Sequence, residues 1–581
     1  MIKKIFKSPE LYCLILFLVG VYVTLALKVE IKDAVVTRSS NTFSTTLPYS
    51  EGMKRGEAFQ VKFNIVEKFN NYDIRIVPDD CAEEMFLNGK NIDLRGIEKR
   101  CDFARGFVLQ DDFLAPYRKG ERNYYEVSIR NNGGSAGLNI FVTQKSLVPK
   151  VVHFATGILF AALCLLVARR LNLGRGLIII FLVGVLCRLA YFAVTPYTGY
   201  SYDVGGHIEY VEYIMDKHSI PKATECWSCY HPPVYYVASI PYYLVGEFMG
   251  ASGTTGLQVF SLLLSLTALL FGLLFLKGFL SGKTLYAASV LWTMWPTLFM
   301  TAPRIGNDQL FYALHILCLW GGINYLNKGK GKYLITSVVS TALAMWTKNT
   351  AMITLGMLLL FTVSGYVMNW RRLRPSGSEI VAWSMIFALF VGVVIQKFIF
   401  GGDLVANVGG INRGLGVGNS IFNYVYFDLK GFLSEPFTNP WKDEMGRQFF
   451  WNYTLKTALF GEFELVRTDV GRCLATVTSI SLLALIVYAI RGFWRTHFRV
   501  IHWLLFLQGG AFFAALMFLR IKYPYACSND FRFIVPVILS FSPFVAWGIN
   551  VDGGSTKWKV VGNATVAVFV LSSAILYILA M

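Results

Sequence analysis

The chain carries little charge for its length. Of its 581 residues, 15% are charged and 55% are hydrophobic, whereas a soluble globular protein has roughly 25% charged residues. This shortage excludes a soluble multi-domain protein. Glycine and proline are present in ordinary numbers, 51 and 18, which excludes a disordered or collagen-like chain. The ten cysteines are scattered and too few for a disulfide scaffold. The composition predicts a polytopic membrane protein.

The charge that is present is unbalanced. The formal net charge is +18, which in a soluble protein would suggest a nucleic-acid partner. Here many of the basic residues stand in short loops between apolar runs. We therefore expect the membrane lipid bilayer as a partner, and no nucleic acid.

Thirteen segments are candidates for membrane-crossing helices, each of which needs about 20 mostly apolar residues. The first is expected to be a retained anchor, because the apolar run Leu11–Leu27 is long for a signal peptide and no convincing cleavage site follows it. The expected spans begin near Leu11, Val151, Leu177, Leu257, Leu285, Gln309, Tyr333, Ala351, Ile380, Leu474, Val500, Phe533 and Val560.

The basic residues of short loops predict the orientation of the chain. With the N-terminus in the cytoplasm, seven segments holding nineteen Lys and Arg residues, and almost no acids, lie inside. The long connections 28–149, 196–254 and 400–470 then lie outside. We expect an integral protein of a bacterial inner (plasma) membrane whose active site is extracytoplasmic.

Four parts are expected along the chain. They are a membrane anchor at 1–29, an extracytoplasmic β-sandwich at 30–148, an additional transmembrane helix with a cytoplasmic turn at 149–175, and a helical membrane core at 176–581 with outer loops 196–254 and 400–470.

Alternating apolar residues predict the strands of the sandwich, for example at Ala58–Ile65 and Tyr72–Val77, and Asn88-Gly89 is a hairpin signal. This segment resembles the jelly-roll carbohydrate-binding modules, so sugar binding and a role as a lid both stay open. Its two cysteines, Cys81 and Cys101, form an even pair in an oxidising compartment, which favours a disulfide.

Asp203 stands just beyond the end of an apolar helix, among aromatic residues and directly after Tyr202. A carboxylate is costly to desolvate there and is not needed for solubility. His207 follows at i+4 and Glu209 lies in the same stretch, which the apolar period predicts to be a short helix at the membrane interface. A helix N-cap is the alternative role for Asp203, and a core or interface histidine is the alternative for His207.

Other polar residues stand in tight turns at the outer membrane boundary, where charged groups are functional candidates by default. Snorkelling from a helix end is the alternative for Lys348, and an N-cap is the alternative for Asp308. The candidates are His231 of His231-Pro232-Pro233-Val234-Tyr235-Tyr236, Arg304, Asn307-Asp308, Thr347-Lys348, Arg520 and Asn529-Asp530-Phe531-Arg532.

This ordered set of motifs resembles the C-type membrane glycosyltransferases, the GT-C fold, over the chain from about Leu177 to the C-terminus. It is most similar to the branch of protein O-mannosyltransferases and aminoarabinose transferases. The resemblance implies a helical GT-C-like core, a donor sugar carried on dolichyl or undecaprenyl phosphate, no further cofactor, and Asp203 as the catalytic base. Some relatives carry two adjacent acids where this chain has Asp203 alone, and the cysteine pair at 226–229 is not part of the pattern.

The chemistry agrees with that resemblance. Outside the cytoplasm a donor must be activated without a nucleotide, and a polyprenyl-phosphate sugar meets that need. Its phosphate leaves as an anion, so only the acceptor hydroxyl needs a base, and a carboxylate can supply one. Cations at the bilayer rim can hold the phosphate, and we expect Arg304, Lys348, Arg520 and Arg532 to do so.

The sequence thus predicts an inverting glycosyltransferase that acts on an extracytoplasmic hydroxyl of a protein, a lipid or a polysaccharide. A transporter or flippase of lipid-linked sugar and a polysaccharide-export membrane protein are the alternatives. Glu462 follows a glycine-rich stretch in the loop 400–470, which we expect to be mobile and near the acceptor. Cys226 and Cys229 suit a disulfide, free thiols or, with His231, a zinc ion, so dependence on a metal stays open.

Overall fold

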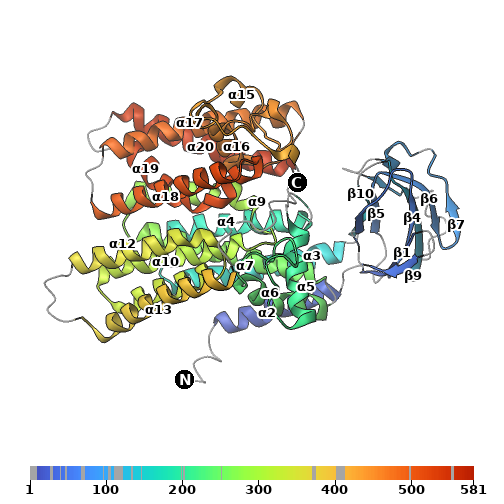
Figure 1. Cartoon of the computed structure of the whole chain (residues 1–581), viewed down its shortest axis with the longest axis horizontal. Coiled ribbons are helices and arrows are strands. Elements are labelled where there is room, and N and C mark those ends of the chain that lie inside the picture. The colour runs from blue at the N-terminus through green and yellow to red at the C-terminus, as the bar shows by residue number, and fades with distance from the viewer. Residues whose placement is uncertain are drawn as a thin grey trace. The chain divides into compact units, whose positions relative to one another are not determined.

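The structure is a computed structural model of the chain, and it divides into two compact units, Met1–Leu163 and Cys164–Met581 (Figure 1). The units are described separately. The structure describes all residues except 1–8, 27–29, 39–40, 46, 48, 67–71, 96, 102–105, 110–121, 133–134, 145–146, 198, 200–202, 250–251, 369–374, 401–412, 467, 496–498, 551–554 and 581.

The first unit joins two helices to a set of strands. Helix α2 (Pro9–Ala26) packs against the middle of α3 (Leu147–Arg170), where the ring centroids of Phe17 and Phe160 are 5.1 Å apart. The strands are β1 (Glu30–Arg38), β2 (Asn41–Ser44), β3 (Tyr49–Gly52), β4 (Ala58–Val66), β5 (Tyr72–Asp79), β6 (Cys81–Leu87), β7 (Lys90–Ile92), β8 (Phe107–Val108), β9 (Arg122–Arg130) and β10 (Ser135–Gln144).

These strands form a six-stranded sheet, in the order β2-β1-β4-β9-β6-β7, and a four-stranded sheet, in the order β3-β10-β5-β8. Alternate apolar side chains of the central strands β4 and β9 are buried, as the period of two requires. Val127 of β9 in one sheet and Ile76 of β5 in the other belong to the same hydrophobic core. The hairpin predicted at Asn88-Gly89 is confirmed, because it joins β6 to β7 with positive φ at both residues.

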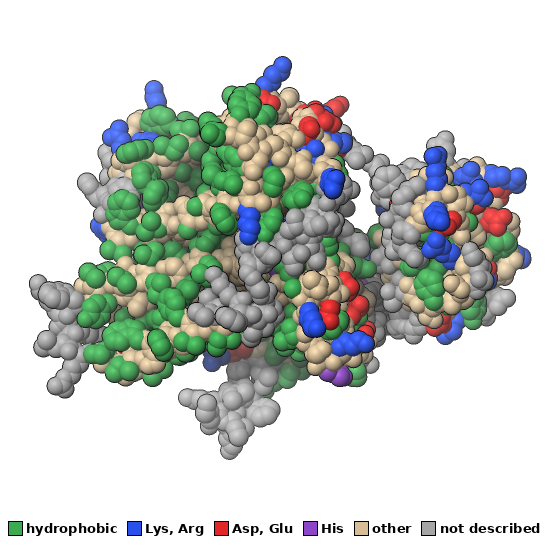
Figure 2. All heavy atoms as spheres, viewed as in Figure 1, with side chains coloured by type: hydrophobic (Ala, Val, Ile, Leu, Met, Phe, Trp, Pro, Cys, Tyr) green, Lys and Arg blue, Asp and Glu red, His purple; other side chains and the backbone are tan. Residues whose placement is uncertain are grey.

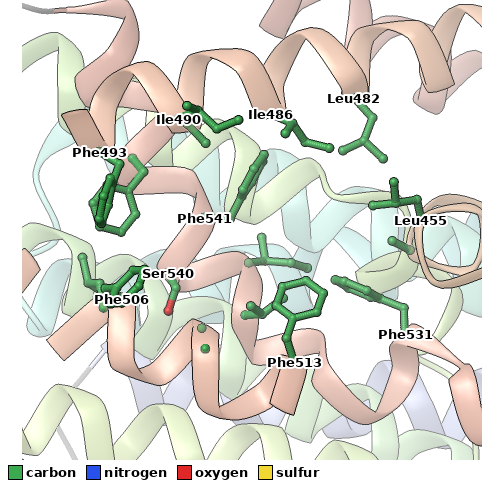
Figure 3. Close-up of a pocket in the computed structure, with 18 of the residues that line it drawn as sticks. Leu455, Leu482, Ile486, Ile490, Phe493, Phe506, Phe513, Phe531, Ser540 and Phe541 are labelled. Carbon is green, nitrogen blue, oxygen red and sulfur yellow. The ribbon is translucent and has the colours of Figure 1, made fainter. Parts of the chain in front are cut away.

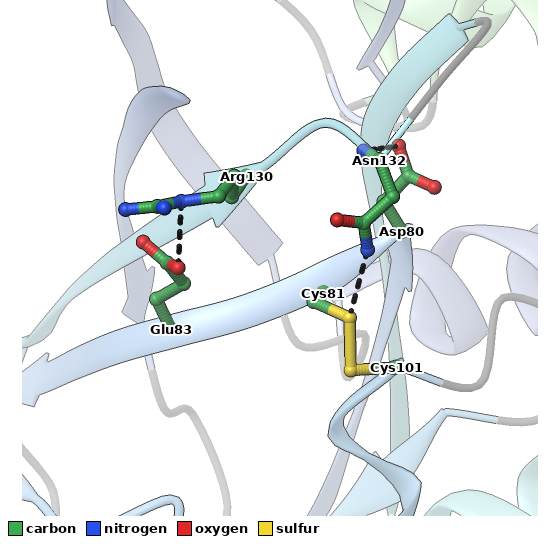
Figure 4. The surroundings of a disulfide bond; sticks show 6 residues. All are labelled: Asp80, Cys81, Glu83, Cys101, Arg130 and Asn132. Atoms are coloured by element: carbon green, nitrogen blue, oxygen red, sulfur yellow. Dashed lines mark hydrogen bonds and ion pairs between the residues drawn. A yellow bond between two sulfur atoms is a disulfide. The ribbon is translucent and has the colours of Figure 1, made fainter. Parts of the chain in front are cut away.

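A disulfide joins Cys81, the first residue of β6, to Cys101, which ends a short 3₁₀ helix (Glu98–Cys101) (Figure 4). The side-chain amide of Asn132 donates to the sulfur of Cys81 at 3.2 Å, and its backbone N–H donates to Asp80 at 3.0 Å. The disulfide therefore links the segment after β7 to the first residue of β6.

The second unit is helical. Its long helices are α4 (Arg175–Val194), α7 (Gly253–Lys277), α8 (Gly282–Met294), α10 (Asp308–Lys328), α11 (Gly331–Met345), α12 (Met352–Met368), α13 (Gly377–Phe400), α17 (Asp469–Arg495), α18 (Val500–Lys522), α19 (Ile538–Ile549) and α20 (Thr556–Ala580), with the short α9 (Pro296–Met300) after α8.

Eight helical segments of the described chain are long and apolar enough to cross a membrane. They are α3, α4, α7, α12 with the turn before it, α17, α18, Ala526–Ile549 and α20. Large apolar side chains face outward from these helices, such as Phe154, which is 73% exposed, and hydrophobic side chains cover much of the helical surface in Figure 2. These features indicate a membrane protein.

Each of the thirteen expected spans begins in or directly beside a helix, but α2, α8, α10, α11 and α13 fall outside the eight. The two shorter apolar segments lie in α2 and α13. Eight spans are thus shown by length and composition, and thirteen stays a prediction.

The long connections of the second unit contain helices of their own. Segment 196–254 holds α5 (Val204–Lys217) and α6 (Val234–Phe248), so the short helix expected after Asp203 is present. Segment 400–470 holds α14 (Ile421–Val425), α15 (Leu429–Ser434) and α16 (Phe450–Phe460). The expectation of a mobile loop is wrong for α16, which buries Tyr453, Leu459 and Phe460. Its apolar side chains need protein packing, and they find it against α9 and the 3₁₀ segment η8 (Phe531–Val537).

Candidate active site

Asp203 occupies the position before the first residue of α5, with a left-handed φ of +54°. Its side chain makes no capping hydrogen bond to the helix, unlike an N-cap carboxylate. Instead Oδ1 accepts from the indole N–H of Trp227 at 3.1 Å, and Oδ2 lies 3.6 Å from Nη2 of Arg532. The side chain is 42% exposed, so one edge of the carboxylate is open to a reactant.

Arg532 bridges two carboxylates. Its Nε lies 3.2 Å from Oδ2 of Asp530, and its own backbone N–H donates to Oδ1 of Asp530 at 2.9 Å. The carbonyl of Arg532 accepts from the hydroxyl of Tyr312 on α10. These contacts fix the guanidinium between Asp530 and Asp203, two residues that are far apart in the sequence.

A second ion pair lies beside it. Lys348, in the turn after α11, pairs with Asp308, the first residue of α10. The ammonium of Lys348 also stands 4.8 Å from the ring centroid of Phe533. Asn307 donates from its side-chain amide to the carbonyl of Thr347 at 3.3 Å, which joins the same two turns. Lys348 is therefore held by protein contacts, rather than extended to the bilayer surface.

Arg304, Asp308, Arg532 and His207 meet at one small cavity, together with Thr301, Ile305, Gly306 and Gln309. Its volume is about 10 Å³, which is room for about one water molecule. Arg304 and Arg532, which the sequence predicted as phosphate ligands, therefore share one cavity. We call the six residues Asp203, Arg304, Asp308, Lys348, Asp530 and Arg532 the rim cluster.

His207 lies under the rim cluster as a neutral side chain. Burial lowers the pKa of His207 to about 4, although Asp203 and Asp308 oppose that shift. Its Nδ1 and the hydroxyl of Tyr236 are 2.9 Å apart, and its ring stacks on that of His231 with centroids 5.9 Å apart. Burial likewise lowers the pKa of His231 well below its ordinary value. Both histidines thus belong to an aromatic core beneath the site.

Glu462 approaches the rim cluster from the segment after α16. It is buried and accepts from the hydroxyl of Tyr453 at 2.5 Å. Burial, reinforced by Asp530, raises the pKa of Glu462 to about 7, while Arg532 and Arg304 oppose the shift. Glu462 is thus a buried carboxyl close to Asp530 and Arg532, and its contact with an acceptor stays a prediction.

Two expected site residues, Arg520 and Glu209, lie elsewhere. Arg520, at the end of α18, donates from Nη2 to the carbonyl of Gly418 at 2.8 Å and lies over the ring of Tyr424, away from the small cavity. Glu209 is on the exposed side of α5. Tyr202 lies outside the described residues.

One residue of the site, Trp227, was not among the expected ones. Asp530 belongs to a predicted motif, but its pairing with Arg532 depends on a 3₁₀ turn that the apolar pattern does not mark. The one sequence signal for Trp227 is its position between Cys226 and Cys229.

Cys226 and Cys229 form a disulfide, so they are not thiolate ligands for zinc. Within the part of the chain that the structure describes, no group of three or more His, Cys, Asp or Glu side chains is arranged to hold a metal ion.

A much larger cavity of about 780 Å³ adjoins the rim cluster at Phe531, the neighbour of Arg532 (Figure 3). Its lining is almost entirely apolar. Figure 3 shows Ile486 and Phe493 of α17 along one side, Phe513 of α18 along the other, and Phe541 of α19 between them. The cavity thus runs along α17, α18 and α19.

Comparisons with known proteins give solved structures alone. No protein-family model matches the chain, and no curated protein matches it. An oligosaccharyltransferase of Archaeoglobus fulgidus in the apo form is 13% identical, with a TM-score of 0.38, over 70% of this chain and 55% of that one. The archaeal oligosaccharyltransferase AglB from Archaeoglobus fulgidus, in complex with an inhibitory peptide and a dolichol-phosphate, is 11% identical, with a TM-score of 0.36, over 69% of this chain and 55% of that one.

ArnT from Cupriavidus metallidurans bound to undecaprenyl phosphate is 11% identical, with a TM-score of 0.31, over 68% of this chain and 77% of that one. The chain thus spans 55% of the length of either oligosaccharyltransferase chain. At these TM-scores the similarity decides nothing about activity, which has to be argued from the residues of the site itself.

Proposed function

We propose that the chain is an inverting glycosyltransferase that moves a sugar from a polyprenyl-phosphate donor to an acceptor hydroxyl on the extracytoplasmic side. The observation that carries this proposal is the rim cluster. It sets the half-exposed carboxylate of Asp203 3.6 Å from Arg532, and it gathers Arg304 and Lys348 from turns that are distant in sequence.

Asp203 is suited to act as the general base. Its helix does not use the carboxylate as a cap, and the two groups that contact it, Trp227 and Arg532, are proton donors that do not take a proton from an acceptor. The acceptor O–H would give its proton to Asp203 while the oxygen attacks the anomeric carbon. The bond from that carbon to the phosphate oxygen breaks, and its electron pair leaves with the polyprenyl phosphate. Attack opposite the leaving group inverts the anomeric centre.

The cations are suited to bind the departing phosphate. Arg532 offers a planar fork of N–H donors, while Lys348 is a point charge. Each is paired with an acid, Arg532 with Asp203 and Asp530, and Lys348 with Asp308. A cavity of about 10 Å³ has no room for a phosphate. Binding therefore requires the phosphate to replace carboxylates at these cations, which frees Asp203 as the phosphate arrives.

The large apolar cavity suits the polyprenyl chain. Its lining is aliphatic and aromatic, and its volume of about 780 Å³ falls within the usual range of ligand sites. It meets the rim cluster at Phe531, so a chain lying in it would carry its phosphate toward Arg532. Burying each CH₂ group of such a chain contributes roughly 0.8 kcal/mol.

The placement of the chain follows as part of this proposal. The rim cluster lies at the helix ends that the basic loops predict to be outside, and thirteen spans are needed for that orientation. The two-sheet unit would then also be extracytoplasmic, as a jelly-roll-like sandwich that binds sugar or serves as a lid.

The test uses the full chain reconstituted in lipid vesicles, with radiolabelled hexoses and aminoarabinose on undecaprenyl phosphate as donors and a cell-envelope extract as acceptor. We expect release of undecaprenyl phosphate together with transfer of label to a macromolecule or lipid, and no release with Asp203→Asn. If every donor stays intact but crosses the vesicle bilayer, the chain is a transporter of lipid-linked sugar and the proposal is wrong.

A further inference from the structure

The loop that precedes α6 reaches back to the catalytic carboxylate. It contains Cys226-Trp227-Ser228-Cys229, closed by the disulfide between its two cysteines. Both cysteines are buried, while Trp227 is 39% exposed. The indole N–H of Trp227 donates to Oδ1 of Asp203 at 3.1 Å. A loop outside the motifs that resemble the glycosyltransferases thus touches the proposed base.

The loop is packed closely on the first turn of α5. A Cβ atom on Gly206 would lie 2.8 Å from Oγ of Ser228 and 3.0 Å from Cβ of Trp227. The hydroxyl of Tyr210, one turn further along α5, donates to the carbonyl of His231 at 3.2 Å. The backbone of Trp227 is therefore held against the same helix that begins after Asp203.

The hydrogen bond from Trp227 leaves Asp203 able to take a proton from an acceptor. An indole N–H donates a hydrogen bond and cannot accept a proton, so Trp227 occupies Oδ1 without competing with Asp203 as a base. The carboxylate makes no cap bond to α5 and is half-exposed, so without Trp227 only the contact of Oδ2 with Arg532, at 3.6 Å, would orient it. With Oδ1 occupied, Oδ2 is fixed on the side of Arg532, where the reacting groups are proposed to meet.

We propose that Trp227 is a positioning residue that fixes the carboxylate of Asp203, and that the Cys226–Cys229 disulfide holds Trp227 in place. This inference rests on the proposed function, in which Asp203 is the base. Misplacing a reacting group by about 1 Å can cost on the order of 10²-fold in rate. The Cys226–Cys229 loop thus helps one carboxylate, Asp203, to act as the base where some relatives carry two adjacent acids.

The experiment compares two substitutions of Trp227 in the reconstituted full chain at pH 8. Trp227→Phe removes the N–H and keeps a ring, whereas Trp227→His places a ring N–H at the equivalent position of a five-membered ring. We expect Trp227→Phe to lower kcat by roughly 10- to 100-fold with KM for the undecaprenyl-phosphate donor unchanged. Trp227→His should restore most of kcat. Trp441→Phe, an exposed tryptophan of another loop, is the matched control and should match the unchanged protein.

The disulfide is tested with Cys226→Ser combined with Cys229→Ser. We expect a smaller loss of kcat in the same direction, because the indole is then held by packing alone. Unchanged kcat in this variant would overturn the role of the disulfide. Equal losses in the Phe and His variants would show that Trp227 acts by packing alone, and unchanged kcat in Trp227→Phe would show that it does not act at all.

A measurement without catalysis separates this inference from the proposed function. In the ¹⁵N-tryptophan-labelled chain, the indole signal of Trp227 is the one that Trp227→Phe removes. We expect Asp203→Asn to shift that signal, and the double serine variant to broaden or shift it. A fully active Asp203→Asn would refute the base and with it the proposed function. A transferase that needs Asp203 but whose Trp227 signal ignores Asp203→Asn would refute the positioning role alone.

Discussion

The rim cluster and the apolar cavity are neighbours that differ in almost every physical respect. They meet between Phe531, which lines the large cavity, and Arg532, which lines the small one. The first is a set of charges, most of them in ion pairs, around a cavity of about 10 Å³, and the second is an apolar space of about 780 Å³. A ligand with a long apolar chain finds room already made, while its charged head has to exchange ion pairs.

This difference follows from the cost of leaving each kind of surface without a ligand. Buried charges need partners, because an unpaired ion in a protein interior costs several kcal/mol. An apolar space at membrane depth can be filled by lipid chains at little cost. The chain of a donor would therefore provide most of the affinity, and the head group would determine whether the charges rearrange. Variants of each region should accordingly differ in which kinetic constant they change.

The largest effect is expected at the one half-exposed carboxylate of the rim cluster. Asp203→Asn keeps the volume and the hydrogen bond from Trp227, but the amide cannot accept a proton at neutral pH. Loss of a positioned base costs on the order of 10² to 10⁴ in rate, so kcat for sugar transfer should fall by that factor. KM for the donor should change little, since the apolar cavity is intact.

Gln258→Ala is a matched control, because Gln258 bonds to the carbonyl of Thr195 in the same outer region but is not in the rim cluster. Both variants should reach the membrane and unfold at similar temperatures. Full activity of Asp203→Asn would move the assignment of the base to Asp308.

The parts of this comparison were not equally predictable from the sequence. The positions of Arg304, Lys348 and Arg532 at helix ends followed from apolar runs and short turns. Their pairing did not, because the partner of Lys348 depends on how α10 and α11 are rotated against each other. The large cavity was not predicted at all, since its walls from α17, α18 and α19 are individually ordinary apolar helix faces.

The same limit explains the error about α16 in segment 400–470. Its glycine-rich beginning suggested mobility, and no pattern marked α16 as buried, because a short helix packed on all sides has no amphipathic period. Conversely, hairpin turns and alternating apolar residues are local signals, so strand β4 and the turn at Asn88-Gly89 could be predicted.

A second test addresses the closed state of the rim cluster. Lys348→Met leaves Asp308 as a nearly buried charge without its cation. Breaking a buried pair from one side costs about 3 to 5 kcal/mol, and since both side chains keep some exposure we expect about 3 kcal/mol of lost stability, seen as a lower unfolding temperature in detergent.

Combining Lys348→Met with Asp308→Asn removes both charges and should restore most of that stability without restoring donor binding. If the single variant is as stable as the unchanged protein, the pair is not closed in solution, and the contrast with the open apolar cavity would disappear.

A third test uses the raised pKa of Glu462, about 7 against an ordinary 4.5. Below the lower value the carboxyl is protonated in both the folded and the unfolded chain. Between the two values the unfolded chain loses the proton and the folded chain keeps it, so stability falls as pH rises, by up to about 3 kcal/mol in total. Above the higher value the difference is constant.

Glu462→Gln should remove this part of the pH dependence, and unfolding temperatures of both proteins between pH 4.5 and 8 measure it. The difference isolates Glu462 from Asp530, Arg532, Arg304 and Tyr453, which face it and stay unchanged. Parallel curves for the two proteins would mean that Glu462 is ionised in the folded chain and that one more negative charge lies beside the rim cluster.

The smallest effect is expected in the apolar cavity, which is large enough to lose part of its volume. Gly510 of α18 lines the cavity, and a Cβ atom added there meets nothing within 4 Å. Gly510→Leu should therefore fold, helped by the better helix propensity of leucine, while its side chain takes space from a bound polyprenyl chain. We expect KM for a full-length donor to rise about tenfold, equivalent to about 1.4 kcal/mol, with kcat unchanged. A donor with a chain of two isoprene units should be affected less, because it does not reach as far along α18.

Gly356→Leu on α12 is the matched control, since its added Cβ also meets nothing within 4 Å and the residue is not in the lining. If both variants bind the long donor as well as the unchanged protein does, the polyprenyl chain lies elsewhere, and the cavity and the rim cluster do not serve one ligand.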